Sequence, residues 1–252
     1  KAHRILIKNG YKLKFRSKLE KDDIDVAEQV GGAEYIVKLD NGEKLWFELQ
    51  WRPVSGRWIQ PKQEPDACEL FHRSTQIKHS KVRLLSPEDN LLQVALQTAK
   101  HTYVRAPGFR LHTDVDRIVT TQNINWLVFE EKVLRLKIKT AVYISLLMAR
   151  NLLGTNVPDN ILMKIQPNKL KVKIMLKWLK KVGVFYPNSH KWNKIGYILF
   201  VSLLYDTWND FFSGVFPSSL EMKSQFNYSN SLLTPYYHLK RLINIMFRRI
   251  EV

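Results

Sequence analysis

LWFELQWRP, residues 45–53, places a single carboxylate, Glu48, inside an otherwise apolar strand. Side chains alternate between the two faces of a strand, so one face carries Leu45, Phe47, Leu49 and Trp51, and the other carries Trp46, Glu48 and Gln50. The preceding Asp-Asn-Gly-Glu, residues 40–43, predicts a tight turn, because Asn and Gly tolerate positive φ. Residues 35–39 are therefore the predicted partner strand. From these residues alone, Glu48 is either a solvated side chain on the exposed face of a hairpin or an acid with a function.

Three further stretches follow this strand. They read VRLLSPEDNLLQVALQTAKH (82–101), APGFRLHTDVDRIV (106–119) and INWLVFEEKV (124–133). The succession resembles the uncharacterised nucleotidyltransferase family of the DNA polymerase beta superfamily, whose members show an ELHWR-like strand, an SPED helix start that ends in KH, an RL…D segment and a DW helix. The resemblance runs from about Lys1 to Pro158. Beyond it, only the FPS segment at residues 216–218 is similar.

The resemblance implies a nucleotidyltransferase that moves a nucleoside monophosphate from a nucleoside triphosphate to an unknown acceptor, with Mg²⁺ as cofactor. Superfamily members hold the metal with two carboxylates spaced Asp-x-Asp and a third acid on the neighbouring strand, and Glu48 matches this third acid. Asp23 and Asp25 have the Asp-x-Asp spelling, but they follow the Gly-Tyr turn at residues 10–11 and are the less favoured metal ligands. The favoured interpretation of residues 18–25 is a solvated charged loop.

The resemblance also predicts a chain truncated at its N-terminus, because no glycine-serine turn precedes the acidic strand and residue 1 is Lys. Glu48 alone is a poor Mg²⁺ site, since this ion is usually held by one or two carboxylates together with substrate phosphates and waters. We therefore expect the chain to lack the Asp-x-Asp pair and to be weak or inactive in catalysis, even if the parent is an enzyme. Lys44 and Arg52 lie close to Glu48 on the hairpin and are candidates for phosphate contacts.

Three polar residues of the later motifs are candidates for a structural or supporting role. His101 ends the SPED helix, where it either binds the last carbonyls or lies near nucleotide phosphates. Arg110 and Asp116 match the RL…D segment of the family. A buried Asp116 is expected to pair with Arg110, Arg117 or His101, and such pairs are more often structural than catalytic.

The net charge of +17, from 40 basic and 23 acidic residues, is the strongest signal of the composition. In residues 169–182, apolar side chains recur at helical spacing at Val172, Met175, Leu176, Leu179 and Val182, and the other face holds Lys169, Lys173, Lys177, Lys180 and Lys181. This basic helix is either a bundle helix with a solvated lysine face or a contact for an anionic partner. The second interpretation gives the alternative function, a non-catalytic basic protein that binds nucleic acid, an anionic membrane surface or an acidic partner.

The remaining composition is typical of a folded protein. With 45% hydrophobic and 12% aromatic residues, the chain is unlike disordered sequences. Its one cysteine, Cys68, cannot form an internal disulfide. The apolar run at residues 195–205 is shorter than the roughly 20 residues of a membrane span, so it predicts a buried helix and no transmembrane segment. The cytoplasm is the expected location.

The predicted fold class is α+β. Residues 1–85 are expected to form a partial nucleotidyltransferase-like domain, with a helix and short strands of a mixed or antiparallel sheet near residues 12–15, 35–39, 45–51 and 81–85, and with a long connector at residues 53–66. Residues 86–252 are expected to form a helical domain. Its first helix starts at Ser86, a good N-cap, and ends at His101; further helices are predicted at residues 111–119, 126–153, 169–182, 195–212 and 233–249.

Overall fold

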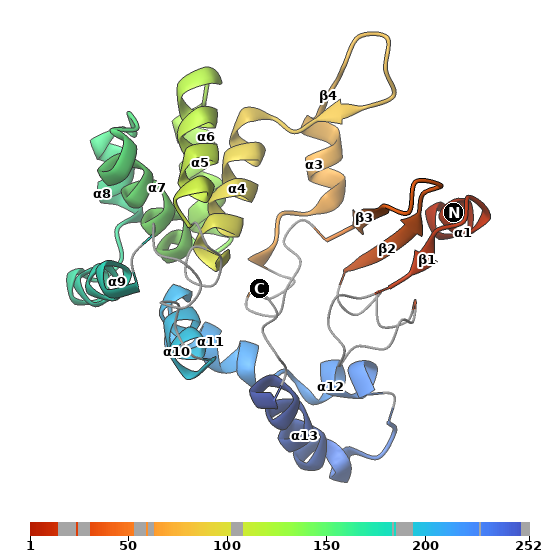
Figure 1. The fold of residues 1–252 in the computed structure, drawn as a ribbon. Helices are drawn as coiled ribbons and strands as arrows, with labels where there is room; N and C mark the ends of the chain where they lie inside the picture. Colours follow the sequence, from red (N-terminus) through yellow and green to blue (C-terminus); the bar gives the residue numbers. More distant parts are fainter. Residues whose placement is uncertain are drawn as a thin grey trace. The chain divides into compact units, whose positions relative to one another are not determined.

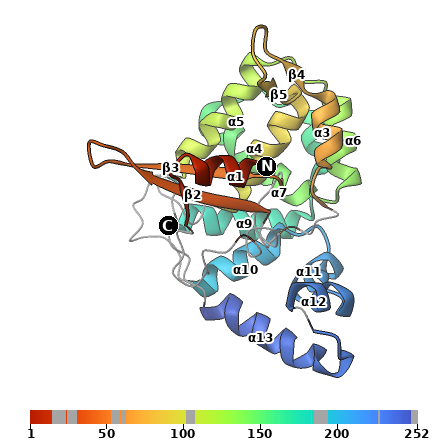
Figure 2. The same cartoon turned by 90° about the vertical axis from the view of Figure 1, so that its right-hand side faces the viewer.

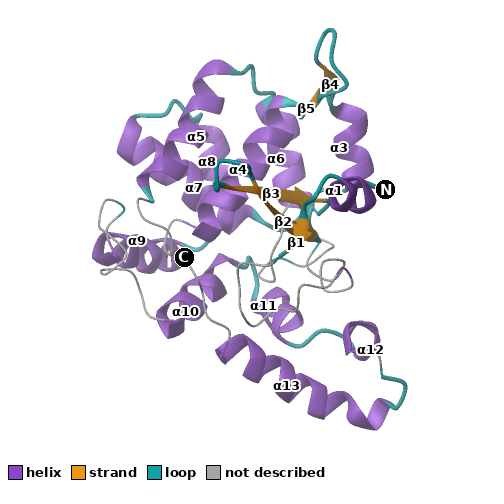
Figure 3. Cartoon of the chain, turned by 45° about the vertical axis from the view of Figure 1, so that its right-hand side comes forward, coloured by secondary structure: helices purple, strands orange, loops and turns teal. Residues whose placement is uncertain are grey.

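The structure is a computed structural model that describes residues 1–14, 24, 31–52, 59, 63–101, 108–182, 184, 194–226 and 228–247. The chain divides into two compact units, one made of residues 1–58 and 213–251 and the other mainly of residues 59–212. Helices dominate, and the strands form two small antiparallel sheets (Figures 1 and 3). The predicted α+β class is confirmed.

The first unit contains a three-stranded sheet with the order β1-β2-β3. Its elements are α1 (Ala2–Lys8), β1 (Lys12–Leu13), β2 (Gly32–Lys38), β3 (Lys44–Gln50), α12 (Ser219–Phe226), a 3-10 helix (Ser231–Leu233) and α13 (Thr234–Phe247). Tyr35 of β2 is fully buried, and the residues packed around it include Leu6, Leu13 and Leu49. One face of the sheet therefore forms the core of this unit.

The predicted hairpin around the Asn-Gly turn is confirmed. Gly42 has φ 84°, which a glycine adopts without strain. The amide of Leu39 donates to the carbonyl of Glu43 at 2.8 Å, and the amide of Gly42 donates to the carbonyl of Leu39 at 2.9 Å. The turn sets the register of β2 and β3, in which Glu34 lies opposite Glu48 and Tyr35 opposite Phe47.

The second unit is helical. It contains α3 (Ala67–Arg73), β4 (Thr75–Gln76), β5 (Arg83–Leu84), α4 (Pro87–His101), α5 (Phe109–Thr121), α6 (Trp126–Arg135), α7 (Lys139–Leu153), α8 (Asp159–Ile165), α9 (Lys169–Val182) and α10 (Lys194–Leu204), while α11 (Trp208–Val215) crosses the boundary between the units. Helix α7 is buried along most of its length and packs against α8 and, as can be followed in Figure 2, against α4 and α5. It is the centre of this unit.

The prediction of one continuous helix over residues 126–153 is wrong, because the chain breaks at Lys137. This residue has φ 54°, and its amide donates to the carbonyl of Leu134 at 3.1 Å. The next amide, that of Ile138, donates to the carbonyl of Val133 at 3.3 Å. Together these bonds form a Schellman motif, which ends α6 with a lysine where a glycine is usual. A lysine at this position gives no sequence signal for the break.

Replacing Lys137 by glycine is expected to raise the free energy of unfolding by about 0.5–1 kcal/mol. A side chain in the left-handed region costs roughly 1–2 kcal/mol, part of which the greater freedom of glycine in the unfolded chain offsets. Urea unfolding would measure the change. As a control, Lys177→Gly in the interior of α9 should lower stability by about 1 kcal/mol. A loss of stability in Lys137→Gly would contradict the left-handed conformation.

The predicted helix at residues 195–212 is also two helices, α10 and α11. The hydroxyl of Thr207 donates to Asp210 Oδ2 at 2.6 Å, and the amide of Asp210 donates to Thr207 Oγ1 at 3.1 Å. This reciprocal pair starts α11 in the manner of a capping box. In α10, Phe200 and Leu204 are buried, as expected of a core helix. None of the helices in the described residues combines the length and apolar character that crossing a bilayer requires.

Candidate functional site

Glu48 lies on the face of the sheet opposite the Tyr35 core, as the strand alternation predicted. Its direct cross-strand neighbour is Glu34 of β2. The amide of Lys14 donates to the carbonyl of Glu34 at 2.9 Å. This bond continues the β1–β2 pairing by one residue and places Lys14 opposite Glu34, on the side away from Glu48. Glu48 and Lys14 are exposed and Glu34 is half-buried. The face therefore presents a row of one lysine and two carboxylates.

The two carboxylates of this row are the strongest candidates for binding a cation. Facing residues of an antiparallel pair have Cβ atoms about 4.5–5.5 Å apart, and like charges at that separation repel unless a cation lies between them. Glu48 Oε1 also accepts a hydrogen bond from Gln50 Nε2, which helps to orient it. Glu34 was not among the site residues predicted from the sequence, although the register set by the Asn-Gly turn places residue 34 opposite residue 48.

The donor chemistry of Glu34 and Glu48 fits Mg²⁺, which takes oxygen ligands and keeps several waters or substrate oxygens. Among the described ranges, no group of three or more His, Cys, Asp and Glu side chains is placed to hold a metal ion. Asp23 and Asp25 lie outside the described residues. The pair would thus form a minimal site to which a nucleotide contributes further oxygens.

Lys44 and Arg52 lie at opposite ends of the hairpin. Each is four residues from Glu48, roughly 13 Å along a strand, and Lys44 faces Lys38 next to the turn. The amide of Arg52 donates to the carbonyl of Gly31 at 3.0 Å, and its side chain packs so closely that a Cβ on Gly31 would lie 2.2 Å from Arg52 Cδ. Neither cation adjoins Glu48, and because they lie on opposite sides of it along the strand, a nucleotide bound at Glu48 could extend toward only one of them.

His101, Arg110 and Asp116 belong to the second unit. His101 is the last residue of α4 and is half-buried, and Arg110 is exposed in the first turn of α5. The hydroxyl of Thr155 donates to Asp116 Oδ1 at 2.7 Å. The expected pairing of Asp116 with Arg110, Arg117 or His101 is therefore replaced by a hydrogen bond from a threonine hydroxyl, which joins α5 to the residues just after α7.

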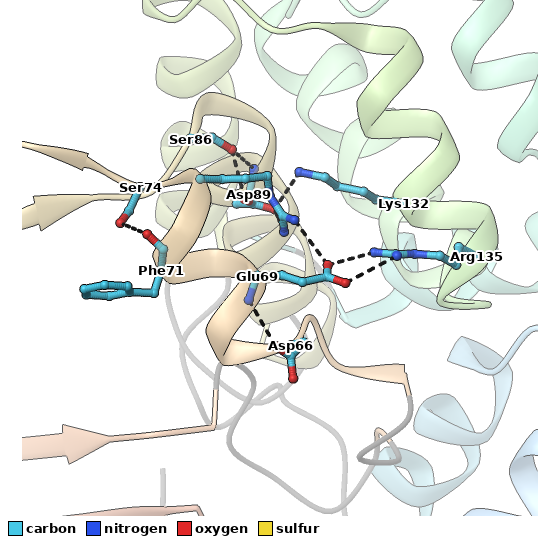
Figure 4. A network of polar contacts seen from close by, with 9 residues as sticks. Asp66, Glu69, Phe71, Ser74, Ser86, Asp89, Lys132 and Arg135 are labelled. Atoms are coloured by element: carbon cyan, nitrogen blue, oxygen red, sulfur yellow. Dashed lines mark hydrogen bonds and ion pairs between the residues drawn. The ribbon is translucent and has the colours of Figure 1, made fainter.

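The SPED motif builds a buried ionic network around Asp89 (Figure 4). Asp89 has no exposed side-chain area and accepts two hydrogen bonds from Arg73, at 2.7 and 3.1 Å. Lys132 Nζ donates to Asp89 Oδ1 at 2.8 Å, and the hydroxyl of Ser86 donates to Oδ2 at 3.0 Å. Burial by itself raises the pKa of Asp89, but the hydrogen bonds from Arg73 and Lys132 outweigh it and leave this pKa below its usual value.

A second carboxylate extends this network toward solvent. Glu69 accepts from Arg135 at 3.0 Å and from Arg73 at 3.1 Å (Figure 4). These hydrogen bonds, with that from Arg135 the stronger, lower the pKa of Glu69. The network ties α3, α4 and α6 together, and its satisfied partners indicate a structural role. The sequence did not reveal these partners of Asp89, because Arg73 and Lys132 are distant from it along the chain.

The basic helix predicted at residues 169–182 is confirmed as α9. Val172, Met175 and Leu179 are buried as expected, Leu176 is half-buried, and the five predicted lysines are exposed. Two apolar residues not considered in the prediction, Leu170 and Ile174, are also exposed. Lys171 is half-buried and donates to the carbonyl of Tyr205. Burial lowers its pKa.

The sequence profile of a family described as an uncharacterised nucleotidyltransferase matches residues 1–154. This range covers more than half of the 252 residues and contains both the sheet with Glu48 and the helices from α3 to α7. No curated protein and no solved structure matches the chain. The resemblance inferred from the motifs is confirmed: the chain belongs to the uncharacterised nucleotidyltransferase family.

Proposed function

We propose that this protein is nucleotidyltransferase-like and binds a nucleoside triphosphate with Mg²⁺ for transfer of the nucleoside monophosphate to an acceptor. Family membership supports the reaction class, and the Glu34–Glu48 pair on one face of the sheet supports the position of the metal. Of the two hairpin cations, Lys44 and Arg52, only one could contact the outer phosphates of a nucleotide held at Glu48, because they lie in opposite directions along the chain. The observation that carries the proposal is the register that brings two carboxylates together on β2 and β3.

Mg²⁺ would supply charge neutralisation for the phosphates and for the leaving pyrophosphate. Glu34 and Glu48 would hold it through carboxylate oxygens, and Gln50 would keep Glu48 oriented through their hydrogen bond. Lys14, in the same row, would limit the negative charge of the face when no cation is bound.

The experiment is nucleotide binding by calorimetry, with and without Mg²⁺. We expect binding that requires Mg²⁺ and saturates with one nucleotide. Glu48→Gln keeps the shape of the side chain and removes its charge, so it should weaken binding about tenfold or more. Glu43→Gln, in the turn of the same hairpin, is the matched control and should bind as the unchanged protein does. Equal affinity of Glu48→Gln and the unchanged protein would refute the role of Glu48.

A second candidate function is binding to an anionic partner without catalysis, with nucleic acid, an anionic membrane surface and an acidic protein as the alternatives. The exposed lysines of α9 favour it. Binding to nucleic acid would weaken steeply with salt and would not need Mg²⁺. This dependence separates it from nucleotide binding at the Glu34–Glu48 pair.

A further inference from the structure

We propose that four lysines of α9 form a docking surface for the phosphate backbone of double-helical nucleic acid. The lysine ridge, as we call it, consists of Lys169, Lys173, Lys177 and Lys181, all exposed. The proposal rests on the second candidate function and selects one partner from its alternatives. It does not depend on the metal site of the sheet.

The spacing of the ridge matches a row of phosphates. Residues four apart in an α-helix are about 6 Å apart along its axis, so the ridge is about 18 Å long. One strand of a duplex carries a phosphate about every 3.4 Å along its axis, so about five phosphates lie beside this length. The lysine side chains are long enough to follow the curvature of the backbone. Four simultaneous contacts are therefore geometrically feasible.

The ridge lysines form no ion pair with the described carboxylates. Helix α9 contains no Asp or Glu, and no carboxylate of the described residues forms an ion pair with its exposed lysines. Lys164, which precedes the helix, differs because it pairs with Glu130 at 2.9 Å. Uncompensated lysines repel one another along a helix face, and a polyanion would relieve this repulsion.

The side chains around the ridge favour a duplex over a single strand. Proteins that bind single strands stack bases on exposed aromatic rings. The aromatic residue of α9, Trp178, is half-buried, and its ring centroid lies 6.2 Å from that of Phe200 in the protein interior. Among the residues that the structure describes, the ridge thus offers charge without a stacking platform, as expected for recognition of a phosphate backbone.

A membrane surface fits α9 less well. A helix that lies in a bilayer interface buries its apolar face among the lipids. In α9 that face already packs inside the protein, where Val172, Met175 and Leu179 are each less than 9% exposed. Of the α9 side chains that the structure describes, Leu170 and Ile174 are the apolar ones exposed among the lysines. This is too small an apolar surface to anchor the helix.

The test is the salt dependence of binding to a labelled duplex, with neither nucleotide nor Mg²⁺ added. Four phosphate contacts predict a slope of about −3.6 in log affinity against log salt, or about a 150-fold loss between roughly 50 and 200 mM. Lys173→Gln with Lys177→Gln should reduce the steepness of this slope by about 2, whereas arginine at both positions should retain it. Lys78→Gln with Lys81→Gln, two exposed lysines in the β4–β5 turn, is the matched control and should leave the slope unchanged.

Three results would overturn the proposal: equal effects of the two glutamine pairs, no effect of the ridge pair, or binding to vesicles containing phosphatidylserine with no binding to the duplex. Equal effects would indicate attraction by the net charge as a whole. Glu48→Gln should bind the duplex normally, and the ridge pair should bind nucleotide normally. Failure of this proposal can therefore be distinguished from failure of the metal-nucleotide site.

Discussion

Replacing Asp89 by asparagine is expected to lower the free energy of unfolding of the second unit by about 3–5 kcal/mol. The asparagine would leave Lys132 and Arg73 without their shared counter-charge. The side chain of Lys132 is only 9% exposed, so water cannot replace the carboxylate at its ammonium group. The loss should be much larger than that of a surface ion pair, for which about 0–1 kcal/mol is usual.

Urea unfolding followed by tryptophan fluorescence would measure the effect of Asp89→Asn. Asp114→Asn, an exposed aspartate on α5, is the control and should change stability by less than about 0.5 kcal/mol. Adding Lys132→Met to the Asp89 variant should recover part of the loss, because it removes the buried unpaired charge. A change below about 1 kcal/mol in Asp89→Asn would mean that the network contributes no more than a surface ion pair does.

The second unit is expected to lose about 3 kcal/mol of stability between pH 7 and pH 4 through His112 alone. Only 1% of this residue is exposed, and burial lowers the pKa of its imidazole from 6.5 to about 4. The unfolded chain takes up the proton near pH 6.5, whereas the folded protein resists it. The contribution of neutral His112 is thus complete above pH 6.5 and is lost as the pH falls toward 4.

Stability measured at several pH values in the unchanged protein and in His112→Gln would isolate this contribution. The substituted protein should lack the slope between pH 6.5 and 4, whatever its stability at pH 7. His72→Gln, an exposed histidine on α3, should retain the slope. Asp89 does not affect this comparison, because its pKa is lowered in the folded protein and its contribution is the same in the unchanged protein and in His112→Gln. Parallel pH profiles for the unchanged protein and His112→Gln would contradict the assignment.

Local signals in the sequence were enough to predict the hairpin and the main helices. The Asn-Gly turn gave the β2–β3 pairing and the face that carries Glu48, and Ser86 with Pro87 gave the start of α4. Two missed helix starts had signals of the same kind. The amide of Glu69 donates to Asp66 at the start of α3, and Thr207 with Asp210 starts α11. Both follow the capping pattern of an oxygen-bearing residue three positions before an acid.

The remaining features depend on contacts between distant residues. The left-handed Lys137 divides α6 from α7 without a glycine to indicate it. Asp89 receives its partners from positions 73 and 132, and a local pattern cannot reveal such an arrangement. Likewise, Asp116 accepts a hydrogen bond from Thr155 and does not pair with a nearby arginine. Which side chains meet in a buried site depends on the tertiary fold. Sequence spacing predicts contacts only between residues within one or two helical turns of each other.

The start of α7 depends on a residue that is synthesised much later. The amides of Lys139 and Thr140 donate to the two carboxylate oxygens of Asp206, at 3.0 and 2.7 Å. Asp206 follows Thr140 by 66 residues, which takes about 3–13 s at typical rates of translation. During that interval the central helix of the unit lacks this cap. The helices of the second unit that precede Asp206 can therefore pack on the ribosome only around a central helix that still lacks this cap, and the unit reaches full stability only after Asp206 has been added.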